Sequence, residues 1–428
     1  MPDADQLKSI FAANVSMSAD GKTVAVAAPF EAKGPGFFEN DAGAVYIYQR
    51  DQAGYWTSQA KITASNQDGF DWFGIGISLS DDGKTLVVGA SGEQSTQVDQ
   101  PDRNDNDAVG AAYIFEADDK GKWQETAYLK SSSSLDVFDL FGGQVEISGD
   151  GQTLAIAAIG HDALSADDPL DNSRSNSGGV YIFQRAADRQ WAQKQFLKAT
   201  VPEGDAGFGY TLAMDYTGSH LAVGMPYSHP TYRYGQVYLY RKNETGLWQS
   251  QGALSGVNRP VAEFGSEIDM DSRGETLAIS MPGMNGSATG VVRIYRRASQ
   301  NVWELSEEIH DPELNMYSDF AQRGLSLSQD GQVIAIGATA TEVADPLNPN
   351  QQLSKAGAAF IFRLDEQQAW QQSVILHAKE SKSDAYYGHA IDLSEDGRAL
   401  VIGASGINLR SPLSLQVNDN LNSSVVIY

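Results

Sequence analysis

The densest group of side chains suited to binding lies in segment 226–234, which reads PYSHPTYRY and is rich in aromatic residues. The group consists of Tyr227, His229, Tyr232, Arg233 and Tyr234. Flat rings with hydrogen-bonding tips beside one cation suit a sugar ring, a peptide or an anionic group. We predict a ligand-binding site here, with Trp72 as a further member because it stands outside the regular spacing of the other Trp residues. The structural alternative is that these tyrosines only cap the edge of a sheet.

A second candidate site lies in the acidic segment 91–109, where Asp102, Asn104 and Asn106 alternate along the chain. Oxygen ligands at this spacing resemble the start of a calcium loop, but the later Gly and the bidentate Glu of an EF-hand are missing. A solvated acidic loop is therefore the favoured interpretation. Calcium is the one cofactor that the sequence suggests, and none is required.

Acidic residues also recur just before the first strand of a repeated unit. They are Asp71, Asp139, Asp205, Glu263, Asp319 and Asp384. If these strands surround an axis, the carboxylates could line the mouth of a channel and hold a cation. Their offset from the following aromatic residue varies, however, which favours a simpler role in capping turns.

Linear signatures of enzymes are missing. The sequence contains no HExxH, GxSxG or GxxxxGK[ST], and its six His residues share no metal-binding spacing. An enzyme built from repeats can assemble its site from single residues on separate repeats. The missing motifs therefore weaken the enzyme hypothesis without removing it.

The element that must position these residues is a repeat. Segment 73–90 reads FGIGISLSDDGKTLVVGA, two alternating strands joined by an Asp-Gly turn, and copies of it begin at the following positions. They are Phe11, Phe73, Phe141, Phe208, Phe264, Phe320 and Tyr387. After each copy comes a Gly- or Ser-led aromatic strand such as GAAYIF at 110–115, and after all but the last a Trp and a fourth strand. The six Trp are Trp56, Trp123, Trp191, Trp248, Trp303 and Trp370. Four antiparallel strands repeated radially describe the blade of a β-propeller.

The last copy stops at Tyr428 after three strands, whereas residues 5–10, DQLKSI, precede the first copy like a fourth strand. We predict an all-β fold: a single domain over 1–428, a seven-bladed β-propeller of four-stranded antiparallel blades, closed by the N-terminal strand completing the last blade. Closure would remove open sheet edges. The alternative is that the N-terminus is frayed.

The paired FG and VGA elements, followed by GAVYIY-type strands, resemble the FG-GAP repeats of the integrin α-subunit propeller, and more closely those of bacterial FG-GAP-repeat proteins. The resemblance implies a surface or exported interaction module. Integrin repeats often hold calcium in a loop between the FG and GAP strands. Here that loop has shrunk to turns such as 80–83, SDDG, which has too few oxygens for calcium. We read it as a hairpin turn.

The amino-acid composition limits which classes of partner the chain can bind. A net charge of −25 disfavours nucleic acid and anionic membrane surfaces, and the chain has no Cys, so disulfides and thiolate metal sites are excluded. No hydrophobic run approaches the roughly 20 residues that span a bilayer. No signal peptide is visible. Because the chain opens on a strand of the repeat, we expect an exported form (extracellular, cell-surface or periplasmic) whose export segment has been removed.

If the strands of each blade are named A to D outward from the axis, the A–B and C–D connections share one face and the B–C and D–A connections share the other. We predict a non-catalytic binding or adhesion module, monomeric as a domain, that recognises a protein, glycan or matrix partner through the B–C/D–A face. The alternatives are a carbohydrate- or ester-processing enzyme and a structural subunit of a surface assembly. A deep central pocket with convergent carboxylates would favour the enzyme.

Overall fold

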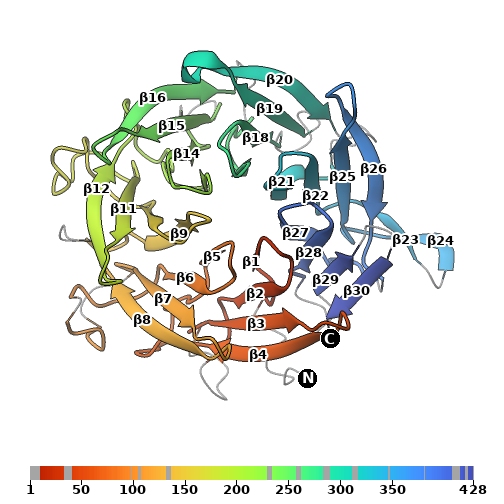
Figure 1. Ribbon diagram of the computed structural model, residues 1–428, viewed down its shortest axis with the longest axis horizontal. Helices are drawn as coiled ribbons and strands as arrows, with labels where there is room; N and C mark the ends of the chain where they lie inside the picture. Colours follow the sequence, from red (N-terminus) through yellow and green to blue (C-terminus); the bar gives the residue numbers. More distant parts are fainter. Residues whose placement is uncertain are drawn as a thin grey trace.

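Four-stranded antiparallel sheets stand radially around a central axis, with the first strand of each innermost and the last at the rim (Figure 1). The computed structural model describes the chain over a set of residue ranges. They are 10–32, 41–97, 99–104, 108–131, 136–228, 234–256, 262–282, 290–310, 317–345, 348–379, 381–406 and, as backbone only, 415–419 and 423–427. Alternating strands and Asp-Gly turns thus fold into propeller blades, as predicted.

The strands of the first three blades follow the repeat in chain order. Blade 1 contains β1 (Val15–Met17), β2 (Thr23–Ala28), β3 (Ala44–Arg50) and β4 (Trp56–Ile62). Blade 2 contains β5 (Gly76–Leu79), β6 (Thr85–Ala90), β7 (Ala111–Ala117) and β8 (Trp123–Leu129). Blade 3 contains β9 (Phe141–Ile147), β10 (Thr153–Ala158), β11 (Gly179–Arg185) and β12 (Trp191–Leu197).

The next three blades keep this order, and blade 6 carries an additional hairpin. Blade 4 contains β13 (Leu212–Met214), β14 (His220–Met225), β15 (Gln236–Lys242) and β16 (Trp248–Ser255). Blade 5 contains β17 (Ile268–Met270), β18 (Thr276–Met281), β19 (Val291–Arg297) and β20 (Trp303–His310), with the short helix η2 (Ser299–Asn301) between the last two. Blade 6 contains β21 (Phe320–Leu327), β22 (Val333–Ala338), β25 (Ala358–Leu364) and β26 (Trp370–Leu376); its B–C loop forms the hairpin of β23 (Val343–Asp345) and β24 (Asn348–Leu353). Within the described ranges, no helix has the length and apolar character needed to cross a bilayer.

The predicted closure of the ring is wrong. The last sheet takes all four strands from the C-terminal part of the chain: β27 (Tyr387–Leu393), β28 (Ala399–Ala404), β29 (Leu415–Asp419) and β30 (Ser423–Ile427). The segment predicted as its third strand is therefore the fourth, and the third, β29, comes from a predicted loop. Most of the predicted closing strand, residues 5–10, lies outside the described residues. Six blades are described with side chains in all four strands, whereas the seventh sheet has only backbone in its outer two. Seven equivalent blades closed by the N-terminal strand do not describe this protein.

The physical reason is that β29 and β30 are neighbours in sequence. An antiparallel hairpin over a short connection costs less loop-closure entropy than pairing with the opposite end of the chain. The first and last blades meet through their inner strands instead. The Met17 N–H donates to the Asp392 carboxylate at 2.7 Å, and Met17 and Val24 pack in one apolar cluster with Val401.

The A–B turns link the blades at one end of the axis. In blade 2, Ser80 Oγ accepts the Thr85 N–H at 3.0 Å and donates to Asp82 at 2.7 Å, while Gly83 has a φ of 66°. These segments are hairpin turns, as the sequence predicted. Seven backbone hydrogen bonds of 2.9–3.1 Å then join turn to turn around the axis. From donor to acceptor they run from Ala19 to Asp81, Asp81 to Gly149, Asp150 to Tyr216, Tyr216 to Ser272, Ser272 to Gln329, Asp330 to Glu395 and Glu395 to Ala19.

The repeated Phe of each FG pair packs between neighbouring blades. Phe73 is fully buried among Val45 and Ile47 of blade 1 and Tyr113 of its own blade. The same contact between blades explains the Gly at the start of the third strands. At Gly110, where φ is +91°, an added Cβ would lie 2.0 Å from the backbone oxygen of Phe141 in the next blade. The Gly-led strand and the FG motif are therefore two sides of one close contact between blades.

The six periodic Trp differ in burial. Trp248 is 4% exposed and Trp370 is also buried, while the other four are only partly buried. We expect Trp248→Ala to reduce the free energy of unfolding by about 3 to 5 kcal/mol, because it removes a buried ring from the core. Trp303→Ala, at a partly buried position, should cost clearly less. Urea unfolding followed by circular dichroism measures both. Equal losses would contradict the assignment of Trp248 to the core.

Candidate functional site

A polar channel runs along the axis, enclosing a space of about 240 Å³. Side chains alternate in direction along a strand, so every second residue of an inner strand faces the axis while its neighbours pack between blades. The axis-facing residue just before the last apolar residue of each inner strand forms one layer, given in order of the blades. It consists of Ser16, Ser78, Glu146, Asp269, Ser326 and Asp392, while Ala213, at the same position in blade 4, packs in the apolar cluster between blades 4 and 5.

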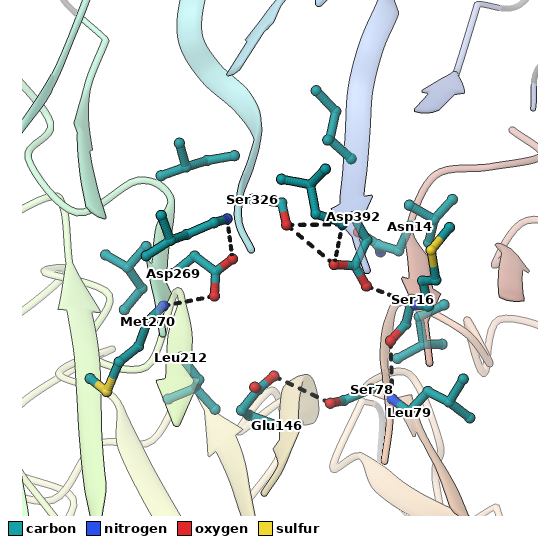
Figure 2. A pocket seen from close by; sticks show the side chains of 18 of the residues that line it. Asn14, Ser16, Ser78, Leu79, Glu146, Leu212, Asp269, Met270, Ser326 and Asp392 are labelled. Carbon is teal, nitrogen blue, oxygen red and sulfur yellow. Dashed lines mark hydrogen bonds between the residues drawn. The ribbon is translucent and has the colours of Figure 1, made fainter. Parts of the chain in front are cut away.

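Most members of this layer tie their blade to the next one (Figure 2). The Ser16 hydroxyl accepts the Leu79 N–H at 3.1 Å, and the Asp269 carboxylate accepts the Leu327 N–H at 2.6 Å. The remaining ties join Ile147 N–H to Ser78 Oγ at 3.1 Å, Leu393 N–H to Ser326 Oγ at 3.1 Å and Met17 N–H to Asp392 Oδ2 at 2.7 Å. The layer is therefore chiefly a structural belt. It is interrupted at Ala213, which has no polar side chain to offer.

Glu146 is the member of this layer least engaged by its neighbours. Its one hydrogen bond within the described part of the chain comes from the Ser78 hydroxyl, at 3.3 Å. By contrast, Asp392 receives the Met17 N–H and also its own Leu393 N–H, at 2.8 Å. Glu146 is thus the carboxyl of this layer with the most capacity left for a ligand.

The carboxyls in the channel resist ionisation. Burial raises the pKa of Glu146 well above its ordinary value, and the negative charges of Asp269 and Asp392 raise it further. Burial likewise raises the pKa of Asp269 to about 6 and that of Asp392 to about 7. The pKa of Glu267 rises to about 7 because burial outweighs the opposing charge of Arg323. Part of this group therefore carries protons at neutral pH.

The A–B end of the channel is narrowed by a contact that crosses the axis. Gln329 of blade 6 donates from Nε2 to Asp81 Oδ1 of blade 2 at 2.7 Å. These two residues, together with Tyr216 and Ser272, line the channel and also a hollow of about 780 Å³ on the A–B face. They form the partition between the two spaces.

A mixed group of charged and aromatic residues lies on blades 4 to 6, toward the B–C/D–A end. The rings of Tyr210 and Tyr227 are 5.3 Å apart, edge to face. Burial lowers the pKa of Arg323, but Tyr210 and Glu267 outweigh it, so the pKa is raised. One residue of the predicted binding segment, Tyr227, thus interacts electrostatically with the Arg323 cation at this end.

The rest of that predicted site is only partly placed. Tyr234 is partly buried, and His229, Tyr232 and Arg233 lie outside the described residues. Trp72 is partly buried in the turn before Phe73, where its backbone N–H donates to the Asp41 carbonyl at 3.1 Å. The ligand-binding role of these residues stays a prediction.

The predicted calcium segment also stays a prediction. Asp102 and Asn104 are exposed, and Asn106 lies outside the described residues. Asn104 Nδ2 donates to the Asp68 carboxylate at 3.1 Å. Among the residues that the structure describes, no three His, Asp or Glu side chains lie close enough together to hold a metal ion.

The acidic residues before the first strands belong to turns. Asp71 and Asp139 accept the N–H groups of Asp68 and Asp136, each at 2.7 Å. Asp205, Glu263, Asp319 and Asp384 have φ values between 46° and 58°.

The channel carboxylates are different residues, which the sequence interpretation missed. The available signal was the strict alternation within each first strand, as in VEI at 145–147 and IDL at 391–393.

A family match now supports the resemblance read from the sequence. Residues 56–115 match the model of the FG-GAP repeat, and the fold is a propeller of the integrin type. The match confirms an FG-GAP repeat in this part of the chain, as the resemblance implied. No curated protein sequence matches it significantly.

Solved structures share its fold at low sequence identity. A chain of hydrazine synthase from Kuenenia stuttgartiensis has a TM-score of 0.56 at 11% identity, covering 97% of this chain and 94% of that one. The β-propeller domain of Cps50 (Swd1) from Myceliophteria thermophila has a TM-score of 0.55 at 11% identity, covering 94% of each. The periplasmic gluconolactonase of Pseudomonas aeruginosa has a TM-score of 0.53 at 12% identity, covering 90% of this chain and 91% of that one. These likenesses concern the fold alone.

The channel carboxyls should make stability depend on pH. Their pKa values in the folded state, about 6 for Asp269 and about 7 for Asp392, lie above the ordinary value of 3.8, so between these limits the folded state binds more protons than the unfolded state. Stability must then fall as the pH rises through this window. We expect a higher Tm at about pH 5.5 than at about pH 8 by differential scanning calorimetry.

The variant Glu146→Gln should reduce this difference in Tm, because it removes one of the mutually repelling carboxyls. Glu366→Gln, at an exposed position, serves as the matched control and should leave the difference unchanged. A Tm that rises toward pH 8 would contradict the assignment.

Proposed function

We propose that the protein is a binding module that recognises a protein, glycan or matrix partner through its B–C/D–A face. One observation carries the proposal: large apolar side chains are exposed on the loops of this face. They are Phe70, Val137, Phe138, Leu164, Leu170, Val201 and Tyr317. Contiguous apolar patches on a protein surface mark interaction sites.

Backbone hydrogen bonds also join blades on this side, as from the Leu140 N–H to the Ala108 carbonyl at 3.1 Å, but they do not use the exposed apolar side chains. The backbone bonds between A–B turns and the belt inside the channel engage the other face and the axis. Asp269 and Asp392 serve as acceptors in that belt, so their convergence in the channel has a structural explanation. This supports binding on the loops over catalysis on the axis.

An exported or cell-surface location is part of the proposal. FG-GAP repeats are typical of extracellular proteins. The acidic, Cys-free composition supports such a location, because it suits a protein that needs neither disulfides nor contact with nucleic acid.

The test is to probe arrays of glycans and matrix proteins with the biotinylated full-length chain. We expect binding that the double variant Val137→Asp with Leu170→Asp weakens about tenfold or more, since charged side chains disrupt an apolar contact. The matched control is Tyr55→Ser with Leu247→Ser, two exposed apolar residues on C–D loops. Binding to nothing on either array, or equal loss in both double variants, would contradict the proposal.

One observation favours a second candidate, a carbohydrate- or ester-processing enzyme. Glu146 is a channel carboxyl with one long hydrogen bond and a raised pKa, as a general acid requires. For this candidate we expect hydrolysis of chromogenic glycosides or esters that Glu146→Gln lowers by a factor of about 100 or more. Glu366→Gln should leave the rate unchanged. Absence of hydrolysis in the unaltered protein would reject the candidate.

A further inference from the structure

Two exposed phenylalanines occupy an unfavourable backbone conformation at consecutive blade junctions. Phe70 lies where blade 1 leads into blade 2 and has a φ of 69°; Phe138 lies where blade 2 leads into blade 3 and has a φ of 67°. Their side chains are 50% and 58% exposed. A bulky residue in left-handed backbone is uncommon because its Cβ crowds the following carbonyl, and an exposed ring gains nothing from burial.

The fold does not require Phe at this position. Asp205 before blade 4 and Asp384 before the last sheet stand at the same place, three residues before the aromatic of the FG motif, with φ values of 56° and 58°. The surroundings also correspond: the backbone oxygens of Phe138 and Asp384 each approach a Gly of the B–C loop, Gly160 and Gly406. Asp tolerates left-handed backbone and water better than Phe does. A role outside folding therefore explains the two rings.

A second feature recurs beside each of these rings. Two residues before Phe70, the Asp68 carboxylate accepts Nδ2 of Asn104 from the long B–C loop of blade 2 at 3.1 Å. Two residues before Phe138, the Asp136 carboxylate accepts Nδ2 of Asn172 from the B–C loop of blade 3. The same Asp–Asn clamp thus fixes a long loop next to each exposed Phe. Its repetition on two adjacent blades argues for one surface built from two similar halves.

The clamped loops add apolar side chains next to the rings. In blade 3, Leu164 and Leu170 are exposed, and the Leu164 N–H donates to the Asp171 carboxylate at 3.1 Å, immediately beside the Asn172 clamp. Val137 is exposed next to Phe138 on the other side of that clamp. We call the set Phe70, Val137, Phe138, Leu164 and Leu170 the two-Phe surface.

The rim of the two-Phe surface is predominantly acidic. Exposed carboxylates on the two clamped loops are Asp99, Asp102, Asp167 and Asp168, whereas the exposed cations of their described residues are Arg103 and Arg174. The whole chain carries a net charge of −25. Acidic potential of this kind repels anionic partners and speeds the approach of cationic ones.

We propose that the two-Phe surface binds a basic segment of a partner protein in which apolar side chains are interspersed with Lys or Arg. The apolar side chains pack on Phe70, Phe138 and the neighbouring leucines, and the cations face the acidic rim. The inference rests on the proposed function, since it names the partner class for the B–C/D–A face. A neutral glycan would use the rings but not the charge.

The test measures fluorescence anisotropy of a short labelled peptide of alternating Lys and Leu with the full-length protein. Comparison peptides replace every Leu by Ser or every Lys by Glu. The decisive variant combines Phe70→Asp with Phe138→Asp, which installs the residue found at this position before blade 4 and before the last sheet, so Tm should not fall. It also makes the surface more acidic. We expect the Lys-Leu peptide to bind and the variant to weaken it about tenfold or more despite the added negative charge.

Tyr55→Ser, which removes an exposed ring elsewhere, is the control and should leave peptide affinity unchanged. Binding of the Lys-Ser peptide as tight as that of Lys-Leu, or unchanged affinity in the double Asp variant, would overturn the inference. Self-association abolished by that variant would assign the surface to a second copy of the chain and equally overturn it. If no peptide binds but the glycan array responds, this inference fails while the proposed function stands.

Discussion

The close contact between consecutive blades is the constraint on which the structure depends. The buried Phe of each FG pair sits so near the third strand of the previous blade that only Gly fits there, as at Gly110 against Phe141. Toward the axis, a short polar side chain of one inner strand accepts an N–H of the next, as Asp269 does from Leu327. Blades that approach this closely must repeat the same residues, and the periodicity of the sequence follows from that requirement.

The same constraint explains why polar groups on the axis are poor evidence for catalysis. Asp269 and Asp392 face the channel and serve as acceptors between blades, and burial raises their pKa whether or not they act on a substrate. Glu146 departs from this pattern because, among the residues that the structure describes, its carboxylate accepts one long hydrogen bond, from Ser78 of the preceding blade. On the loops of the B–C/D–A face, backbone carbonyls such as that of Ala108 accept the hydrogen bonds between blades, and the exposed side chains are not needed for them. Their exposed rings at Phe70 and Phe138, where Asp205 and Asp384 satisfy the same turn, are the residues that folding leaves unexplained.

Much of the architecture was predictable because it arises from local rules. Alternating strands, Asp-Gly turns and the repeated FG motif predicted four-stranded blades and the hairpin role of turns such as 80–83. The end of the ring was not predictable by the same rules. The repeat suggested that Ser423–Tyr428 was a third strand, yet Leu415–Asp419, which lacks the Gly-led aromatic pattern, takes that place. Pairing between neighbours in the chain prevailed over the analogy between repeats.

The sequence by itself determined the blade and its repetition, because strand period, turn chemistry and the Phe–Gly contact are written within each repeat. Only the tertiary structure decided which residues meet. Glu146, Asp269 and Asp392 lie on separate blades, more than a hundred residues apart in the chain, and face one channel only once the sheets are arranged around an axis. Likewise, the Asp136–Asn172 clamp joins two loops that show no pairing signal. Such contacts depend on the placement of whole blades, which no local pattern records.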